Sequence, residues 1–217
     1  MTGEPAPIPV APEMPEAQEQ PSSRSKVKDA IIEIATTVGL AVILYLIITT
    51  FVVQTFRVEQ TSMQNTLQSG EHLLIDKLTP RFDDYSRGDI IVFHPNGATD
   101  QTPYIKRVIG VGGDNVQIPG DGFVYINGVQ LDETEYTFPA PGENEPTFAK
   151  NAGDEWDVPE GMLFVLGDHR MASTDSRNAS VGLVDTEYVV GRSWLRFWPL
   201  NTLGIVQTPA YPELEES

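Results

Sequence analysis

The sequence predicts a mainly β protein with one transmembrane helix near its N-terminus. Residues 34–56 contain no Asp, Glu, Lys or Arg, and the stretch LAVILYLIITTFVV is apolar on every helical face. Beyond it, short β-rich runs alternate with Gly, Pro, Asn and Asp, a pattern typical of antiparallel sheets. A chain of 217 residues is long enough for one or two compact domains.

The first predicted elements are a tail and a membrane span. Residues 1–29 are expected to form a disordered tail, because the first 23 hold six Pro, four Glu and no Lys or Arg. Residues 30–56 are expected to form the transmembrane helix, since about 20 apolar residues cross a ~30 Å hydrocarbon layer. A buried core helix or a cleaved signal peptide is the alternative, but the former is usually striped and the latter has a shorter apolar run.

The charges beside the span predict its orientation. Arg24, Lys26 and Lys28 precede it, whereas only Arg57 follows it closely. By the positive-inside rule the tail lies in the cytoplasm and the rest of the chain on the far side. We therefore expect a single-pass protein of the plasma membrane, with the lipid bilayer as one of its partners.

The remaining residues, 57–211, are expected to form an extracytoplasmic β domain. The predicted strands lie in HLLIDKL, DIIVFHP, YIKRVIGV, NVQIP, FVYINGVQL, MLFVLGD and YVVGRSWLRFW. Asn127-Gly128 predicts a two-residue hairpin, because a type I′ turn needs positive φ at both positions. Residues 132–160 hold nine acidic residues and one Lys, which indicates a solvated excursion or a small β extension inserted into the domain.

Two further segments have less definite predictions. Residues 212–217 form a short acidic end that is expected to be frayed. Trp194, Phe197 and Trp198 are interpreted as core residues, with a place at the bilayer interface as the alternative.

Composition excludes several classes of function. A formal charge of -17 would repel polyphosphate, so nucleic-acid binding is set aside. The absence of Cys excludes disulfides, thiolate metal sites and cysteine nucleophiles. A hydrolytic site would then be a Ser/His/acid triad, a carboxylate pair, a metal site, or a Ser or Thr activated by Lys. His72 and His94 stand at predicted strand ends, and His169 has no accompanying triad motif.

The Ser/Lys option has the sharpest support. Ser62 comes six residues after Phe56, within roughly 20 Å of the membrane surface for an extended chain. Lys106 lies in a strand in which it and Arg107 point to opposite faces, so one charge must face the less solvated side. A desolvated Lys loses its proton readily and can then serve as a general base for a hydroxyl. The plain alternatives are a turn Ser and a Lys that reaches solvent.

A third constellation follows the predicted strand MLFV, in residues 166–177. It could be a solvated turn held by surface ion pairs of little energetic worth. Its functional use would be to orient a neighbouring base, with Ser173 as the candidate and Asp175 with Arg177 as a stiffening pair.

Together these segments resemble the bacterial type I signal peptidases, the Ser/Lys endopeptidases that remove signal peptides from exported proteins. The family's S-M-x-P-T-L motif appears as SMQNTL, R-G-D-I-V-V-F as RGDIIVF, Y-I-K-R-V-I-G-x-P-G-D as YIKRVIGVGGD, and G-D-N-R-x-x-S-x-D-S-R as GDHRMASTDSR. The resemblance implies a β-rich catalytic domain without a metal or organic cofactor. It further implies Ser62 as nucleophile, Lys106 as general base, Ser173 as orienter of the amine, and three structural supports: Asp175, Arg177 and Arg107.

The sequence departs from the family pattern at four positions. Asn65 and Gly112 each replace a Pro, which loosens a turn without touching a reactive atom, and His169 replaces an Asn. Gln60 stands where many relatives carry a Ser that helps to hold the oxyanion. The backbone N–H of Ser62 and the side chain of Gln60 are the oxyanion candidates, with Thr61 as a further possibility.

The expected function is cleavage of exported preproteins after Ala-x-Ala-like sites by a membrane-anchored enzyme. The oligomeric state and the precursors stay open. One rival is a Ser/Lys hydrolase with another target, such as a self-cleaving repressor. The other is an anchored β-rich binding domain without catalysis.

Overall fold

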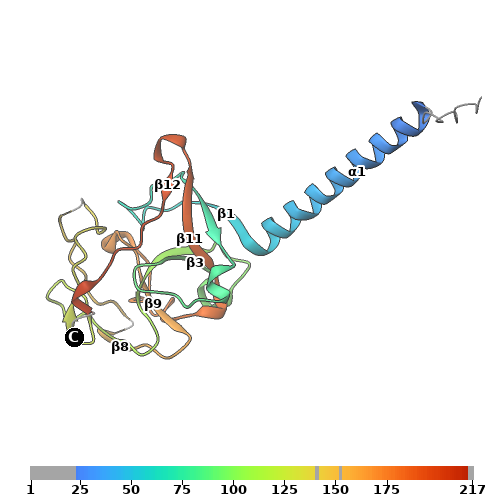
Figure 1. Ribbon diagram of the computed structural model, residues 1–217. Helices are drawn as coiled ribbons and strands as arrows, with labels where there is room; N and C mark the ends of the chain where they lie inside the picture. The colour runs from blue at the N-terminus through green and yellow to red at the C-terminus, as the bar shows by residue number, and fades with distance from the viewer. Residues whose placement is uncertain (1–22, 140–141, 152, 215–217) are drawn as a thin grey trace, which may run out of the picture. The chain divides into compact units, whose positions relative to one another are not determined.

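The computed structural model describes residues 23–139, 142–151 and 153–214 (Figure 1). The chain divides into two units, residues 1–45 and 46–217. The main element of the first is the helix α1, Ser23–Ile47. Residues 27–52 are long and apolar enough to cross a membrane, and none of the most apolar window is buried inside the protein. The expected tail lies largely outside the described residues, and α1 begins seven residues before the predicted start of the span at residue 30.

The predicted span also ends too late. A short π-helical segment, Ile48–Val52, follows α1, and Val53–Arg57 then forms the strand β1. Its register pairs Val53 with Asp76 and Arg57 with His72 of the next strand. Val, Thr and Phe suit a strand as well as an apolar helix, so composition alone does not mark this boundary.

The second unit contains two antiparallel sheets, which confirms the mainly β prediction. The larger sheet has eight strands in the order β1-β2-β11-β3-β4-β9-β10, with β12 paired to β11. The smaller sheet has the order β7-β6-β5-β8. Beyond β1, the strands are β2 His72–Asp76, β3 Ile90–Phe93, β4 Tyr104–Gly110, β5 Asn115–Gln117, β6 Tyr125–Ile126, β7 Val129–Gln130, β8 Glu155–Asp157, β9 Met162–Leu166, β10 Val184–Asp185, β11 Val189–Trp198 and β12 Gly204–Ile205.

Short helical turns connect these strands. They are the 3-10 segments Thr79–Arg81, Pro95–Gly97, Arg170–Ala172, Thr186–Tyr188, Leu200–Thr202 and Pro212–Leu214. All seven predicted runs contain strands. The hairpin prediction is confirmed as well, since Asn127 and Gly128 have φ values of 53° and 83°.

Three apolar clusters form the core and flank β4. One joins β4 and β9 to the small sheet and includes Ile109, Val116, Trp156 and Phe164. A second lies under the segment between β1 and β2, and a third packs Ile91, Phe93 and Val108 against Val165. Because β4 lies between β3 and β9 in the sheet, its last five residues are all buried.

Residues 132–160, called the insertion below, are less solvated than the sequence predicts. The insertion contributes β8 to the small sheet, as the β-extension interpretation expects. Its first half nevertheless buries polar residues, including Glu133, Thr137 and Thr147. Its acidic composition therefore indicates an exposed loop only in part, because several of its polar groups have internal partners.

Two terminal predictions are corrected. Of the predicted frayed end, Pro212–Leu214 forms a 3-10 turn in which Glu213 accepts a hydrogen bond from the Asp132 backbone N–H, and residues 215–217 lie outside the described residues. Trp194 and Trp198 are 50% and 51% exposed, so the core interpretation is wrong for both. They belong to the hairpin of β11 and β12, where Ile205 is exposed as well.

Candidate active site

Ser62 lies in a tight turn between β1 and β2. The turn is held by the Leu67 N–H, which donates to the Met63 carbonyl at 2.8 Å, and the side chains of Met63 and Leu67 are buried in the core beneath it. The Ser62 carbonyl accepts a hydrogen bond from the His169 backbone N–H at 3.1 Å. These contacts fix residues 62–67, called the nucleophile turn below after the predicted role of Ser62, against the loop that follows β9. Ser62 itself is 3% exposed.

The Lys106 amine reaches the Ser62 hydroxyl. Lys106 Nζ lies 2.8 Å from Ser62 Oγ and donates to the Ile105 carbonyl at 2.9 Å. The predicted alternative of a solvent-exposed Lys is wrong, because Lys106 is 1% exposed. Arg107 is equally buried, so the expectation that only one of the two charges would face away from solvent is corrected. Both faces of β4 are covered.

Burial determines the charge state of the amine. Loss of solvation lowers the pKa of Lys106 from 10.5 to about 8, although the carboxylates of Asp175 and Asp168 favour the charged form. A substantial fraction of this amine is therefore neutral near pH 8. A neutral amine in contact with a hydroxyl can accept its proton.

The end of the β4–β9 ladder leaves space for Ser62 beside Lys106. The β4–β9 ladder runs from Gly110 to Arg107, where it pairs Arg107 with Leu166 and stops. Beyond Leu166 the chain turns away, and the nucleophile turn enters this space. Gly167 is required there, because a Cβ on this residue would lie 2.5 Å from the Ser62 carbonyl oxygen and closer still to Ser173 Oγ.

The loop after β9 is a buried ionic network rather than a solvated turn. Arg177 binds Asp175 through two nitrogen atoms, each at 2.8 Å, and both residues are at most 1% exposed. Burial alone raises the pKa of Asp175, but the Arg177 guanidinium holds it below its ordinary value. The predicted alternative, a solvated turn held by surface ion pairs, is therefore wrong. The pair stiffens the segment that carries Ser173.

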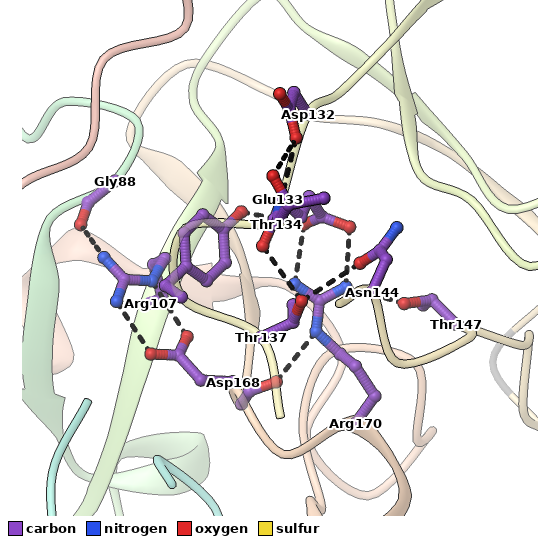
Figure 2. A network of polar contacts seen from close by, with 12 residues as sticks. Gly88, Arg107, Asp132, Glu133, Thr134, Thr137, Asn144, Thr147, Asp168 and Arg170 are labelled. Atoms are coloured by element: carbon purple, nitrogen blue, oxygen red, sulfur yellow. Dashed lines mark hydrogen bonds and ion pairs between the residues drawn. The ribbon is translucent and has the colours of Figure 1, made fainter. Parts of the chain in front are cut away.

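A second pair joins this loop to β4. Arg107 binds Asp168 with two hydrogen bonds of 2.8 and 2.7 Å and also donates to the Gly88 carbonyl (Figure 2). The same guanidinium lies 4.1 Å from the centre of the Tyr136 ring. Burial disfavours the charged form of Arg107. The Asp168 carboxylate more than offsets this effect and raises the pKa of Arg107 above its ordinary value. Arg107 thus supports the strand that presents Lys106.

Figure 2 shows a third pair, between the insertion and the same loop. Arg170 donates to both carboxylate oxygens of Glu133, at 2.9 and 2.6 Å, and to the Thr147 hydroxyl at 2.7 Å. Arg170 and Glu133 are at most 1% exposed. Burial disfavours the Arg170 charge, but Glu133 more than compensates and raises the pKa of Arg170.

The remaining predicted positions have mixed outcomes. The Ser173 hydroxyl is buried but has no hydrogen-bond partner among the described residues, and the partners of Lys106 Nζ are Ser62 and Ile105. The role of Ser173 as orienter of the amine therefore stays a prediction. Gln60 and Thr61 are exposed beside the nucleophile turn, and the second oxyanion donor stays open.

A cavity of about 340 Å³ lies next to Ile105, the residue before Lys106. It is lined by Thr55, Phe56, Arg57, Val58, Glu59, Gln60, Leu73, Val92, Thr102, Pro103 and Ile105. Its buried wall is apolar, formed by Val58, Leu73 and Val92. Among the described residues, β9 pairs with β4 only from Arg107 onward, so the main chain of Ile105 has no ladder partner on that side, next to Lys106.

Sequence reasoning missed three contributors to this site. Asp168 and Arg170 lie inside the quoted loop motif but were not assigned partners. Lys150 donates to the Ser173 carbonyl at 2.6 Å. The sequence sets Lys150 apart only as the single Lys of the acidic insertion. No group of His, Cys, Asp or Glu suited to hold a metal occurs among the described residues.

Comparison with known proteins places these features in a family. Residues 31–198 match the family described as "Signal peptidase, peptidase S26". The chain is 37% identical to signal peptidase I of Leptolyngbya laminosa over 94% of this chain and 96% of the relative. It is 38% identical to signal peptidase I of Bacillus licheniformis over 81% and 93%.

A solved signal peptidase I from Enterococcus faecalis V583 is 35% identical, covers 51% of this chain and 97% of its own, and gives a TM-score of 0.39.

Proposed function

The chain belongs to the peptidase S26 family of signal peptidases, serine endopeptidases that cleave signal peptides, and we propose that it works through a Ser62 nucleophile and a Lys106 general base. The observation that carries this proposal is the 2.8 Å contact between Lys106 Nζ and Ser62 Oγ in a buried site. Family membership favours this proposal over both rivals, the binding domain and the hydrolase with another target.

The reaction would proceed by two acyl transfers. The neutral Lys106 amine takes the hydroxyl proton as Ser62 Oγ attacks the scissile carbonyl, and the ammonium so formed protonates the leaving amine. The same amine then takes a proton from water, whose oxygen attacks the ester and releases the signal peptide. The Ser62 backbone N–H and the Gln60 side chain are the proposed oxyanion donors.

The substrate would bind as an added strand. The unpaired main chain of Ile105 offers hydrogen bonds, and an extended peptide sends alternate side chains toward the same wall. The apolar wall of the cavity next to Ile105 would receive those side chains, and cleavage after Ala-x-Ala rests on family membership rather than on the size of the cavity. An anchor of residues 27–52 that places the catalytic domain outside the cytoplasm would bring the site to membrane-held precursors.

The test uses the full chain in detergent and a preprotein with an Ala-x-Ala site. Ser62→Ala and Lys106→Ala should each lower kcat/KM on the order of 10⁶-fold, as loss of the nucleophile or the base does in other serine proteases. Ser180→Ala and Lys77→Ala are the matched controls and should retain activity. The native profile should rise through an apparent pKa of about 8, that of the buried amine. Processing by Ser62→Ala at the native rate would refute the proposal.

A further inference from the structure

The insertion is tied to both catalytic segments. Glu133 anchors it to Arg170 in the loop after β9, as Figure 2 shows. Asn65, in the nucleophile turn, donates its side-chain N–H to the Pro139 carbonyl. The Phe138 ring stacks on His169 with 4.1 Å between ring centres. The insertion is therefore built onto the site at three separate points.

Its far end brings Lys150 to Ser173. Lys150 Nζ donates to the Ser173 carbonyl at 2.6 Å. The chain on either side is also held, because Arg177 donates to the Phe148 carbonyl and the Ala179 N–H donates to the Asn151 side chain. The position of Lys150 is thus fixed by its neighbours, although the residue as a whole is exposed.

The other charges around the dyad are paired. Asp168 is bound by Arg107 and Asp175 by Arg177, each through a two-pronged contact. Tyr104 places its ring 5.3 Å from Lys106 Nζ. Lys150 differs because its ammonium contacts a carbonyl, and none of the carboxylates in the described part of the chain forms an ion pair with it.

We propose that Lys150 is a positioning residue for the peptidase reaction, which holds the Ser173 segment and favours the uncharged form of the Lys106 amine by presenting a second cation to it. This inference rests on the proposed Ser62/Lys106 chemistry. It gives the insertion a role in catalysis besides its structural one.

Electrostatics agree with the geometry. Burial is the main cause of the lowered pKa of Lys106, the carboxylates of Asp175 and Asp168 oppose it, and the Lys150 charge adds to it. Burial and the nearby Arg177 charge likewise lower the pKa of Lys150 itself. Mutual repulsion of this kind favours the neutral form of a nucleophile or base in other active sites.

The test compares pH profiles of kcat/KM for the full chain in detergent with an Ala-x-Ala preprotein. Lys150→Met should move the apparent pKa upward by about 0.3–0.5 unit, the size expected of one solvent-screened charge. Activity should then fall about two- to threefold at pH 7, with little loss at pH 10, where the amine is neutral in both proteins. High salt should reduce the shift, because Lys150 is exposed to solvent.

Three further variants make the result decisive. Lys150→Arg keeps the charge and should keep the native profile, whereas Lys150→Gln should behave like Lys150→Met. Lys77→Met removes the same charge from a Lys bound to the Thr50 carbonyl and should leave the profile unchanged. Superimposable profiles for Lys150→Met and the native chain, or a loss equal at every pH, would overturn the inference. Inactive Ser62→Ala and Lys106→Ala would show in the same assay that the proposed dyad still stands.

Discussion

The lowered pKa of the buried Lys106 amine should make the free energy of unfolding depend on pH, and this effect does not require catalysis. Its pKa is about 8 in the folded chain against an ordinary value of 10.5, a difference of about 2.5 units. At 1.36 kcal/mol per unit, burial of the ammonium destabilises the folded state by about 3 kcal/mol when both states are protonated. This penalty is complete below pH 8 and disappears as the pH rises toward 10.5. Stability should therefore rise with pH across this window.

Replacement of Lys106 by Met removes the titrating group but keeps the length of the side chain. The free energy of unfolding, measured by urea denaturation of the full chain in detergent at pH 7, 8 and 9, should be compared for both proteins. The advantage of Lys106→Met over the native chain should shrink by about 1 kcal/mol between pH 7 and pH 9. Lys77→Met serves as the control and should give a difference that does not change with pH. A difference for Lys106→Met that is equally flat would refute the assignment of a depressed pKa.

Two other substitutions test the surroundings of the dyad. Gly167→Ala should abolish most processing while the protein stays folded, because the added methyl group collides with the Ser62 carbonyl; preprotein cleavage and far-UV circular dichroism would check this, and an active variant would contradict it. Glu133→Gln should destabilise the protein by about 3–5 kcal/mol, since it leaves the Arg170 charge buried and unpaired, and Arg170→Met in the same chain should recover part of that loss. Equal stability of the single and double variants in urea would argue against a tightly coupled pair.

The sequence predicts most of the strands, because those are short apolar runs between turn residues; it misses β1, whose residues also suit an apolar helix, and the short strands β8, β10 and β12. It also indicates the dyad, since Ser62 and Lys106 lie in motifs whose order matches a known family. It does not predict that both faces of β4 are covered. The alternation of a strand places Lys106 and Arg107 on opposite faces but does not show what packs on either face. The sequence does not predict the partners of Arg170 and Lys150 for a related reason. These contacts join the insertion to the loop after β9 across 37 and 23 residues of sequence, and the acidic composition of the insertion points to solvent.

The open edge of β4 also bears on inhibition. A strand-shaped inhibitor that pairs with the main chain at Ile105 would draw affinity from peptide groups, which every amino acid carries. Side-chain replacements in the cavity wall could reject a bulky substituent but leave those main-chain bonds intact. Drug resistance would then have to arise by reshaping the strand itself, and the same strand carries the base, so such changes would also cost the enzyme its activity.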